Sequence, residues 1–253
     1  MTTPQKRHVI VTGGGRGLGT AIVRSLADAG HDVTFTYRSA KAEADALLKE
    51  MSAAHAGQKF AAESVDLSDK AAVEAFCAKL KDTPFSGFVH NAGASYDALA
   101  VMIDQEKAEA AMQVNYWSFV KICGTVVRGM MRAKDGRVAV IGSITALQAN
   151  QGNAAYASTK AALLGYARTL AIEVGRTGVT VNYVAPGFID TEMLAGYAKY
   201  REKMEEQVPA RRFAKPEEVA SIVTYLLSPL ASYVTGAILP VDGGVSAALG
   251  IHR

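Results

Sequence analysis

Residues 12–19 read Thr12-Gly-Gly-Gly-Arg-Gly-Leu-Gly19 and join a short apolar run, Arg7–Thr12, to a segment with helical spacing of apolar residues, Gly17–Ala29. Glycines allow a tight turn and let the backbone approach a pyrophosphate, and a helix N-terminus offers free N–H groups and a positive dipole end. The spacing is T-G-x-x-x-G-x-G rather than G-x-G-x-x-G, so the glycines alone are a weak signal. Their place between a strand and a helix favours a dinucleotide-binding loop over a turn without a ligand.

Outward from this loop, strand-like and helix-like stretches alternate along the chain. Such alternation indicates parallel strands joined by right-handed crossovers. We therefore expect an α/β fold, with residues 1–253 forming a single-domain Rossmann-type doubly wound parallel sheet of about seven strands flanked by helices. The expected strands are Arg7–Thr12, Asp32–Tyr37, Phe60–Val65, Phe85–His90, Arg137–Ile141, Val179–Val184 and Ala237–Val241. The expected helices are Gly17–Ala29, a helix capped by Ser39 and ending near Ala56, one capped by Ser68 and ending near Lys81, Asp104–Arg132, Ala154–Val174, Thr191–Glu206 and Pro216–Leu227.

Composition narrows the possible classes of protein. The net charge is +3 and basic runs are no longer than Arg211-Arg212, whereas nucleic-acid binders usually cluster Lys and Arg. Cys77 and Cys123 are far apart, which favours simple packing over a disulfide or a zinc site. The first eight residues lack an apolar signal core, and no run of about 20 apolar residues occurs. We expect no metal, no nucleic-acid or membrane partner, and a cytoplasmic location.

Charge near the end of the second expected strand indicates which dinucleotide binds. NAD binders usually place Asp or Glu there to accept a hydrogen bond from the ribose hydroxyl. Here the strand ends in Tyr37-Arg38, without an acid, and Arg16 lies inside the glycine loop. Two guanidiniums suit a 2′-phosphate through charge-assisted hydrogen bonds. The alternative is two merely solvated arginines, and we expect NADP(H).

A serine, a tyrosine and a lysine follow the fifth expected strand. Ser143 comes directly after Arg137–Ile141, and Tyr156-Ala-Ser-Thr-Lys160 lies near the start of the next helix. Residues i and i+4 share one helix face, so Lys160 should lie beside Tyr156 and lower the pKa of the phenol from about 10 toward neutrality. Such a tyrosine can protonate a developing alkoxide, and Ser143 can donate a second hydrogen bond to that oxygen. Tyr-x-x-x-Lys is common by chance, so the prediction depends on its coincidence with the glycine loop and Ser143.

Together these motifs resemble those of the short-chain dehydrogenase/reductase family over essentially the whole chain. One position departs from the family pattern, because His90 stands where the family has Asn. His90 ends an expected strand, so we expect a structural role, and a pH-sensing role stays open. The matching segments are Thr12–Gly19, Asp66-Leu67, Asn91-Ala92-Gly93, Asn115, Ser143, Tyr156-x-x-x-Lys160, Pro186-Gly187 and Thr191.

The resemblance implies a catalytic set of four residues. Tyr156 is the expected general acid/base, Ser143 holds the substrate oxygen, and Lys160 binds the nicotinamide ribose and lowers the tyrosine pKa. Asn115 is expected to anchor a water that links Lys160 to solvent. The resemblance also implies transfer of the 4-pro-S hydride.

The resemblance further implies where the dinucleotide lies. Asp66 is expected to bind the adenine amino group, Asn91 and Gly93 to line the adenosine, and Ile189 and Thr191 to contact the carboxamide. The whole expected cofactor set is Thr12, Gly13, Gly15, Arg16, Gly17, Leu18, Gly19, Arg38, Asp66, Leu67, Asn91, Ala92, Gly93, Tyr156, Lys160, Pro186, Gly187, Ile189 and Thr191.

Within the family, the chain is most similar to the 3-oxoacyl-acyl-carrier-protein reductases. This similarity implies NADPH-dependent reduction of a 3-oxoacyl thioester, as in fatty acid or polyketide-type biosynthesis, with Arg128 docking an acyl carrier protein. The second docking arginine is replaced by Ile172, with Arg168 nearby, so a coenzyme A ester stays open as the substrate. The segments that carry the similarity are Val181–Thr191, Gln207–Arg211, Ser232–Gly236 and Val241–Gly244.

The substrate side and the assembly are less well defined by the sequence. Tyr96 and Gln148–Gly152 are expected to form one wall, and Phe188–Gln207, which includes Met193, either a lid over an acyl chain or ordinary packing. The resemblance implies a homotetramer built on two-fold contacts. Two rival functions stay open: a dehydrogenase for an alcohol, sugar or steroid, and, more remotely, an NADP-binding regulator without turnover.

Overall fold

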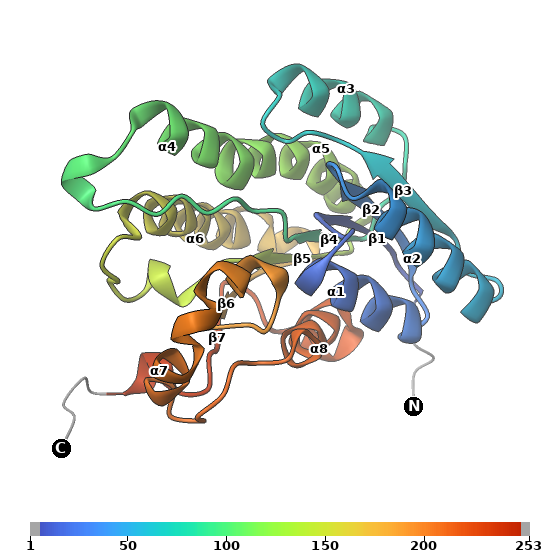
Figure 1. Cartoon of the computed structure of the whole chain (residues 1–253). Coiled ribbons are helices and arrows are strands. Elements are labelled where there is room, and N and C mark those ends of the chain that lie inside the picture. Colours follow the sequence, from blue (N-terminus) through green and yellow to red (C-terminus); the bar gives the residue numbers. More distant parts are fainter. Residues whose placement is uncertain (1–5, 249–253) are drawn as a thin grey trace.

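The computed structural model describes residues 6–248, and these form one sheet of seven parallel strands in the order β3-β2-β1-β4-β5-β6-β7 (Figure 1). For residues 193, 195, 197 and 198 it describes the backbone only. The predicted fold class is confirmed, and each predicted strand overlaps an observed one. The strands are β1 (His8–Thr12), β2 (Asp32–Tyr37), β3 (Phe60–Ser64), β4 (Gly87–His90), β5 (Gly136–Ile141), β6 (Val179–Pro186) and β7 (Ile238–Val241).

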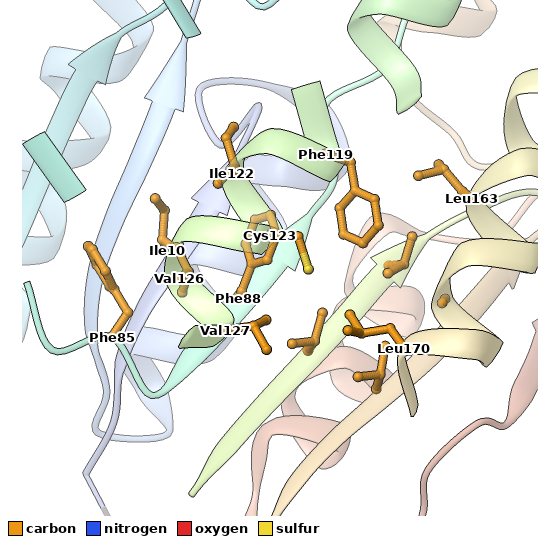
Figure 2. Packing of buried hydrophobic residues seen from close by; sticks show 14 of the residues in the cluster. Ile10, Phe85, Phe88, Phe119, Ile122, Cys123, Val126, Val127, Leu163 and Leu170 are labelled. Carbon is orange, nitrogen blue, oxygen red and sulfur yellow. The ribbon is translucent and has the colours of Figure 1, made fainter. Parts of the chain in front are cut away.

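Helices cover both faces of the sheet, as a parallel sheet requires. Val9 and Val11 of β1 pack with α1 (Gly17–Asp28), α2 (Lys41–Ala54) and α8 (Pro216–Leu227). Ile10 faces the opposite layer, because successive side chains of a strand point to opposite faces. That layer contains α3 (Lys70–Leu80), α5 (Ser118–Ala133) and α6 (Ala154–Val174). Figure 2 shows its packing, in which Phe88 of β4 stacks on Phe119 of α5 with ring centroids 5.8 Å apart.

The single helix predicted over Asp104–Arg132 is wrong in one respect. The segment forms α4 (Gln105–Met112), a five-residue π-helix (Gln113–Trp117) and then α5. The π-helix changes which backbone carbonyls are paired within the helix, and such insertions are frequent at functional sites. Apolar spacing does not reveal it, and the π-helix contains Asn115, whose contacts are described below.

Both predicted serine caps are wrong as well. The N-cap of α3 is Asp69, whose side chain accepts a hydrogen bond from the Ala71 N–H at 2.8 Å. Ser68 instead donates its hydroxyl to Asp66 at 2.6 Å. The N-cap of α2 is Ala40, without a side-chain capping hydrogen bond. Ser and Asp are both favourable N-cap residues, so the sequence does not decide which of two adjacent ones caps the helix.

The segment after β6 has the predicted position but a different helix type. A 3-10 helix covers Glu192–Tyr200, and the short α7 (Arg201–Glu206) follows. Arg201 forms a bidentate pair with Asp190, at 2.8 and 2.9 Å, which joins the start of α7 to the loop that follows β6.

Residues 6–248 contain neither a membrane-spanning helix nor a cluster of metal-binding side chains. None of the helices there is long and apolar enough to cross a bilayer. The same residues contain no cluster of three or more His, Cys, Asp or Glu side chains arranged to hold a metal ion.

Candidate active site

The glycine loop leaves β1 at the carboxyl end of the sheet and packs against the end of β4. Gly13 has φ of +68°, and a Cβ on it would lie 2.8 Å from the Ala92 Cα, so only glycine fits there. Asn91 donates its side-chain amide to the Gly13 carbonyl at 2.8 Å. The Thr12 hydroxyl accepts from the N–H groups of Asn91 and Ala92, each at 3.2 Å. Residues predicted to line the cofactor thus also hold the loop in shape.

The loop offers a site for an anionic dinucleotide. The first turn of α1 contains no acidic residue, and Arg16, its N-cap, makes no side-chain capping hydrogen bond. The N-terminal N–H groups are thus available to a phosphate. Arg16 and Arg38 are both exposed, and Tyr37, at the end of β2, lies against Gly15. The glycine loop and the end of β2 therefore fit NADP better than NAD, because they supply Arg16 and Arg38 and no acid directly after β2.

Other predicted cofactor residues surround the same loop. Thr191 lies beside the start of α1, since a Cβ on Gly17 would be 3.5 Å from the Thr191 methyl. Asp66 is exposed, and its pKa is lowered by hydrogen bonds from Ser68 and, more weakly, by the charge of Arg38. The loop, the end of β3 and the segment after β6 therefore meet at one edge of the sheet.

Ser143 lies at the carboxyl end of β5, and its hydroxyl has a defined orientation. The Ser143 Oγ accepts hydrogen bonds from the Thr145 N–H at 3.2 Å and from the Thr145 hydroxyl at 2.9 Å. A hydroxyl has one proton, so Ser143 retains that proton for donation. Its hydrogen bond to Tyr156 lowers the pKa of the phenol. Ser143 and Tyr156 therefore lie together near the carboxyl end of β5.

Lys160 is buried beside this pair. Its Nζ donates to the Ile141 carbonyl at 2.9 Å and lies 5.6 Å from the centre of the Tyr156 ring. Burial lowers the pKa of Lys160 to about 8. Burial, with a smaller contribution from the charge of Asp97, raises the pKa of Tyr156 to about 12 and outweighs the lowering effect of Ser143. The pKa of Tyr156 is therefore not lowered toward neutrality in the protein without its cofactor, contrary to the expectation. The phenol is protonated at neutral pH.

Asn115 lies in the π-helix and is fully buried. Its side-chain oxygen accepts from the Ala94 N–H at 2.7 Å. Its side-chain nitrogen donates to the Ala94 carbonyl at 2.9 Å and to the Thr159 hydroxyl at 2.8 Å. Asn115 therefore fixes the loop after β4 against α6, immediately beside Lys160.

His90 links Asn115 to the glycine loop. Its Nε2 donates to the Asn115 backbone carbonyl at 2.9 Å, because a carbonyl can only accept. Its Nδ1 must then accept from the Thr12 hydroxyl, at 3.0 Å. Burial, together with the charge of Lys160, lowers the pKa of His90 to about 3. A neutral, fully buried imidazole agrees with the structural role and argues against pH sensing near neutrality.

The residues predicted to form the substrate wall make hydrogen bonds to neighbouring loops. Tyr96 accepts from the Asp104 N–H at 2.9 Å, and Gln148 donates to the Ser246 carbonyl at 2.8 Å. The Gly152 carbonyl accepts from the Ala98 N–H at 2.8 Å. The side chain of Met193 lies outside the described residues.

Arg128 is separate from the catalytic residues. It is exposed on α5 and lines a groove with Tyr166 and Glu173 of α6. Ile172, at the position of the missing arginine, is 84% exposed on α6. Both positions therefore face outward on neighbouring helices.

Sequence reasoning missed two residues that hold Ser143. Thr145 orients the hydroxyl, and a second hydroxyl residue two positions after a serine is a pattern that can reveal such a contact. Tyr183 of β6 accepts from the Ser143 N–H at 3.1 Å and donates to the Lys160 carbonyl at 3.1 Å. Tyr183 is 40 residues from Ser143, and nothing in the local sequence indicates this contact.

The sheet order, the glycine loop and the Ser143–Tyr156–Lys160 arrangement define a dinucleotide-dependent oxidoreductase that acts on a C=O or CH–OH group. The chain belongs to the short-chain dehydrogenase/reductase family: a family model described as enoyl-(acyl carrier protein) reductase matches residues 13–246. This confirms the resemblance found in the sequence.

Three known proteins illustrate this membership. The chain is 37% identical over 242 residues to the 3-oxoacyl-(acyl-carrier-protein) reductase MabA of Mycobacterium bovis, which covers 94% of this chain and 92% of the relative. It is 37% identical over 241 residues to an acetoacetyl-CoA reductase of Synechocystis, covering 94% and 96%. A solved structure from Beutenbergia cavernae, described as an NAD(P)-dependent gluconate 5-dehydrogenase with NADP bound at low occupancy, is 30% identical with a TM-score of 0.90, covering 96% and 97%.

Proposed function

We propose that this protein reduces a 3-oxoacyl thioester to the 3-hydroxyacyl thioester with NADPH, as in fatty acid biosynthesis. The observation that carries the proposal is that Ser143, whose oxygen accepts from the Thr145 hydroxyl, and the buried Lys160 both lie beside a protonated Tyr156. The relatives named for 3-oxoacyl-carrier and acetoacetyl-CoA reduction support the choice of substrate.

The residues at the carboxyl edge of the sheet suit NADP(H) as the cofactor. The glycine loop, the uncapped start of α1 and the exposed Arg16 and Arg38 favour a phosphorylated dinucleotide. The solved relative with bound NADP supports the same choice.

The chain's own residues supply the proton and stabilise the charge. When bound, NADPH supplies the hydride that reduces the carbonyl carbon. Tyr156 gives its phenolic proton to the oxygen as negative charge develops there, and Ser143 donates a hydrogen bond to the same oxygen. The Lys160 cation stabilises the phenolate that remains. Asn115 positions the backbone beside Lys160 and, in this proposal, anchors the water that resupplies its proton.

The acyl group is a thioester of either a carrier protein or coenzyme A. Arg128 is exposed and suited to an acidic carrier, whereas the exposed Ile172 offers no charge. One relative is named for each type of substrate. Arg128 is therefore the residue whose replacement by Glu should slow reduction of the carrier-bound ester and leave the coenzyme A ester unaffected.

The test is loss of near-ultraviolet NADPH absorbance with purified protein and acetoacetyl thioesters, beside NADH. We expect oxidation of NADPH with the 3-oxoacyl ester and much slower oxidation of NADH. Crotonyl-CoA tests the enoyl reduction named by the family model, and gluconate-type ketoses test the sugar alternative. Turnover of one of these and of no 3-oxoacyl ester would overturn the proposal, and so would the absence of any turnover.

A further inference from the structure

One phenol hydroxyl joins the backbones of two proposed catalytic residues. Tyr183 of β6 is 1% exposed, and its ring belongs to the core between the sheet and α5 and α6. An amide N–H can only donate and a carbonyl can only accept. The Tyr183 hydroxyl therefore accepts from the Ser143 N–H and donates to the Lys160 carbonyl, each at 3.1 Å. Burial raises its pKa, so the hydroxyl keeps the proton that this second bond needs.

These contacts complete a closed ring of hydrogen bonds. The Lys160 ammonium donates to the Ile141 carbonyl at 2.9 Å, two residues before Ser143. The backbone continues from Ile141 to Ser143, whose N–H donates to the Tyr183 hydroxyl. That hydroxyl donates to the Lys160 carbonyl, which closes the ring. Both the ammonium group and the backbone carbonyl of Lys160 thus connect the first turns of α6 to the sheet.

The space for the phenol depends on a glycine. A Cβ on Gly142 would overlap the Tyr183 ring, so any other residue there would displace the ring. The Gly142 N–H donates to the Val184 carbonyl at 2.7 Å, which fixes this part of β5 against β6. Gly142 and Tyr183 therefore form a matched pair across two strands.

We propose that Tyr183 is a positioning residue for carbonyl reduction, whose hydroxyl sets the placement of Ser143 relative to Lys160 and Tyr156. The inference rests on the proposed function, because that function gives Ser143 and Tyr156 their roles toward the substrate oxygen. Small misplacements of reacting groups slow an enzyme strongly, by up to about 100-fold for ~1 Å. Removal of the hydroxyl frees the Ser143 N–H from its partner and lets the serine shift, while the dinucleotide loop stays intact.

The first experiment compares Tyr183→Phe with the wild-type protein and with Val181→Ala. Val181 is fully buried two residues away on the same strand and in the same core, so its truncation loosens packing without touching the ring of hydrogen bonds. For each we measure kcat, KM, the Kd of NADPH by fluorescence, and the primary isotope effect with NADPH deuterated at C4.

For Tyr183→Phe we expect kcat to fall about 10- to 100-fold, the isotope effect to rise, and the Kd of NADPH to stay within about twofold. Simple partial unfolding lowers the active fraction but leaves the isotope effect of the remaining molecules unchanged, as expected for Val181→Ala. An unchanged kcat in Tyr183→Phe, or a reduced kcat with the wild-type isotope effect, would overturn the proposal.

A second pair of variants separates folding from positioning. Gly142→Ala should lower the melting temperature and kcat together, because the ring of Tyr183 must move. Gly142→Ala combined with Tyr183→Val restores space but lacks the hydroxyl, so it should recover melting temperature without recovering kcat. Recovery of both would show that Tyr183 serves packing alone.

Hydrogen exchange at the Ser143 amide distinguishes failure of this inference from failure of the proposed function. If wild-type protein reduces no 3-oxoacyl thioester, the proposed function fails, and exchange still reports on the hydroxyl. We expect exchange at Ser143 to be at least about 10-fold faster in Tyr183→Phe than in wild type or Val181→Ala, since the protecting hydrogen bond is lost. Equal exchange in all three proteins would overturn the positioning role.

Discussion

At the residue scale, Lys160 sets the electrostatics of the site. It is 3% exposed, and its ammonium rests on the Ile141 carbonyl within reach of the Tyr156 ring. A buried cation is costly, so burial lowers its pKa, and the same burial raises the pKa of Tyr156. The two shifts leave a protonated phenol beside a lysine with a pKa of about 8, so at neutral pH Tyr156 holds the proton that reduction consumes and Lys160 carries its charge.

The pH dependence of reduction follows from these values. The pKa of Lys160 is lowered from 10.5 to about 8, so the charge is present below that pH and is lost above it. We expect kcat for NADPH oxidation to be level near pH 7 and to fall by up to ~10-fold per unit above about 8, because the phenolate then lacks its cation. Tyr156, with a pKa of about 12, stays protonated and adds no loss in this range. A pH profile of kcat that stays level to about pH 10 would contradict this.

Arg38 should determine the cofactor preference. Arg38→Ala removes one exposed guanidinium at the end of β2, and a hydrogen bond to a charged group is worth about 1.5–3 kcal/mol. We expect the Kd of NADPH to rise about 10- to 100-fold and the Kd of NADH to stay the same in fluorescence titrations. Arg24→Ala is the control, because Arg24 pairs with Glu50 at 2.8 Å, away from the glycine loop. Equal NADPH affinity in Arg38→Ala and wild type would rule out this role.

At the scale of elements, the sequence predicts regular structure better than its interruptions. Apolar runs predict the strands, and the glycines predict the loop after β1. The helix α6 is predicted with the bounds that the structure shows. The π-helix leaves no mark in the apolar spacing, and the contacts of Tyr183 and His90 join residues distant in the chain. His90 meets the Asn115 carbonyl from 25 residues away, and Tyr183 meets Ser143 from 40.

The cap of α3 gives a test at this scale. Asp69 accepts from the Ala71 N–H, whereas Ser68 binds Asp66. Loss of an N-cap typically lowers the free energy of unfolding by about 1 kcal/mol. We expect Asp69→Ala to show this loss in urea denaturation and Ser68→Ala to lose less. The reverse order would restore Ser68 as the cap.

At the scale of the whole molecule, the topology brings the site together. The carboxyl ends of β1, β4, β5 and β6 lie at one edge of the sheet. Thr12 and His90 end β1 and β4, and Ser143 and Thr191 lie after β5 and β6. Ligands of such sheets bind beyond these ends. The general place of the site is therefore predictable from the alternation of strands and helices. The substrate wall stays a prediction, and its Tyr96 and Gln148 contact backbone groups of neighbouring loops.

The assembly remains a prediction from the family resemblance. Ile172 and Met131 are exposed apolar side chains on α6 and α5, 84% and 37% exposed, which an association of helices could cover. We expect a homotetramer with two-fold contacts, measured as a particle of four chains by size-exclusion chromatography with light scattering. A monomer at micromolar concentration would reject it.

The central claim is that Tyr156 protonates the oxygen of a carbonyl reduced by NADPH. Single-turnover stopped-flow of NADPH oxidation by Tyr156→Phe, beside wild type with acetoacetyl-CoA, tests it most directly. We expect the variant to bind NADPH with unchanged Kd and to transfer hydride at least about 100-fold more slowly. Hydride transfer at the wild-type rate in this variant would contradict the account.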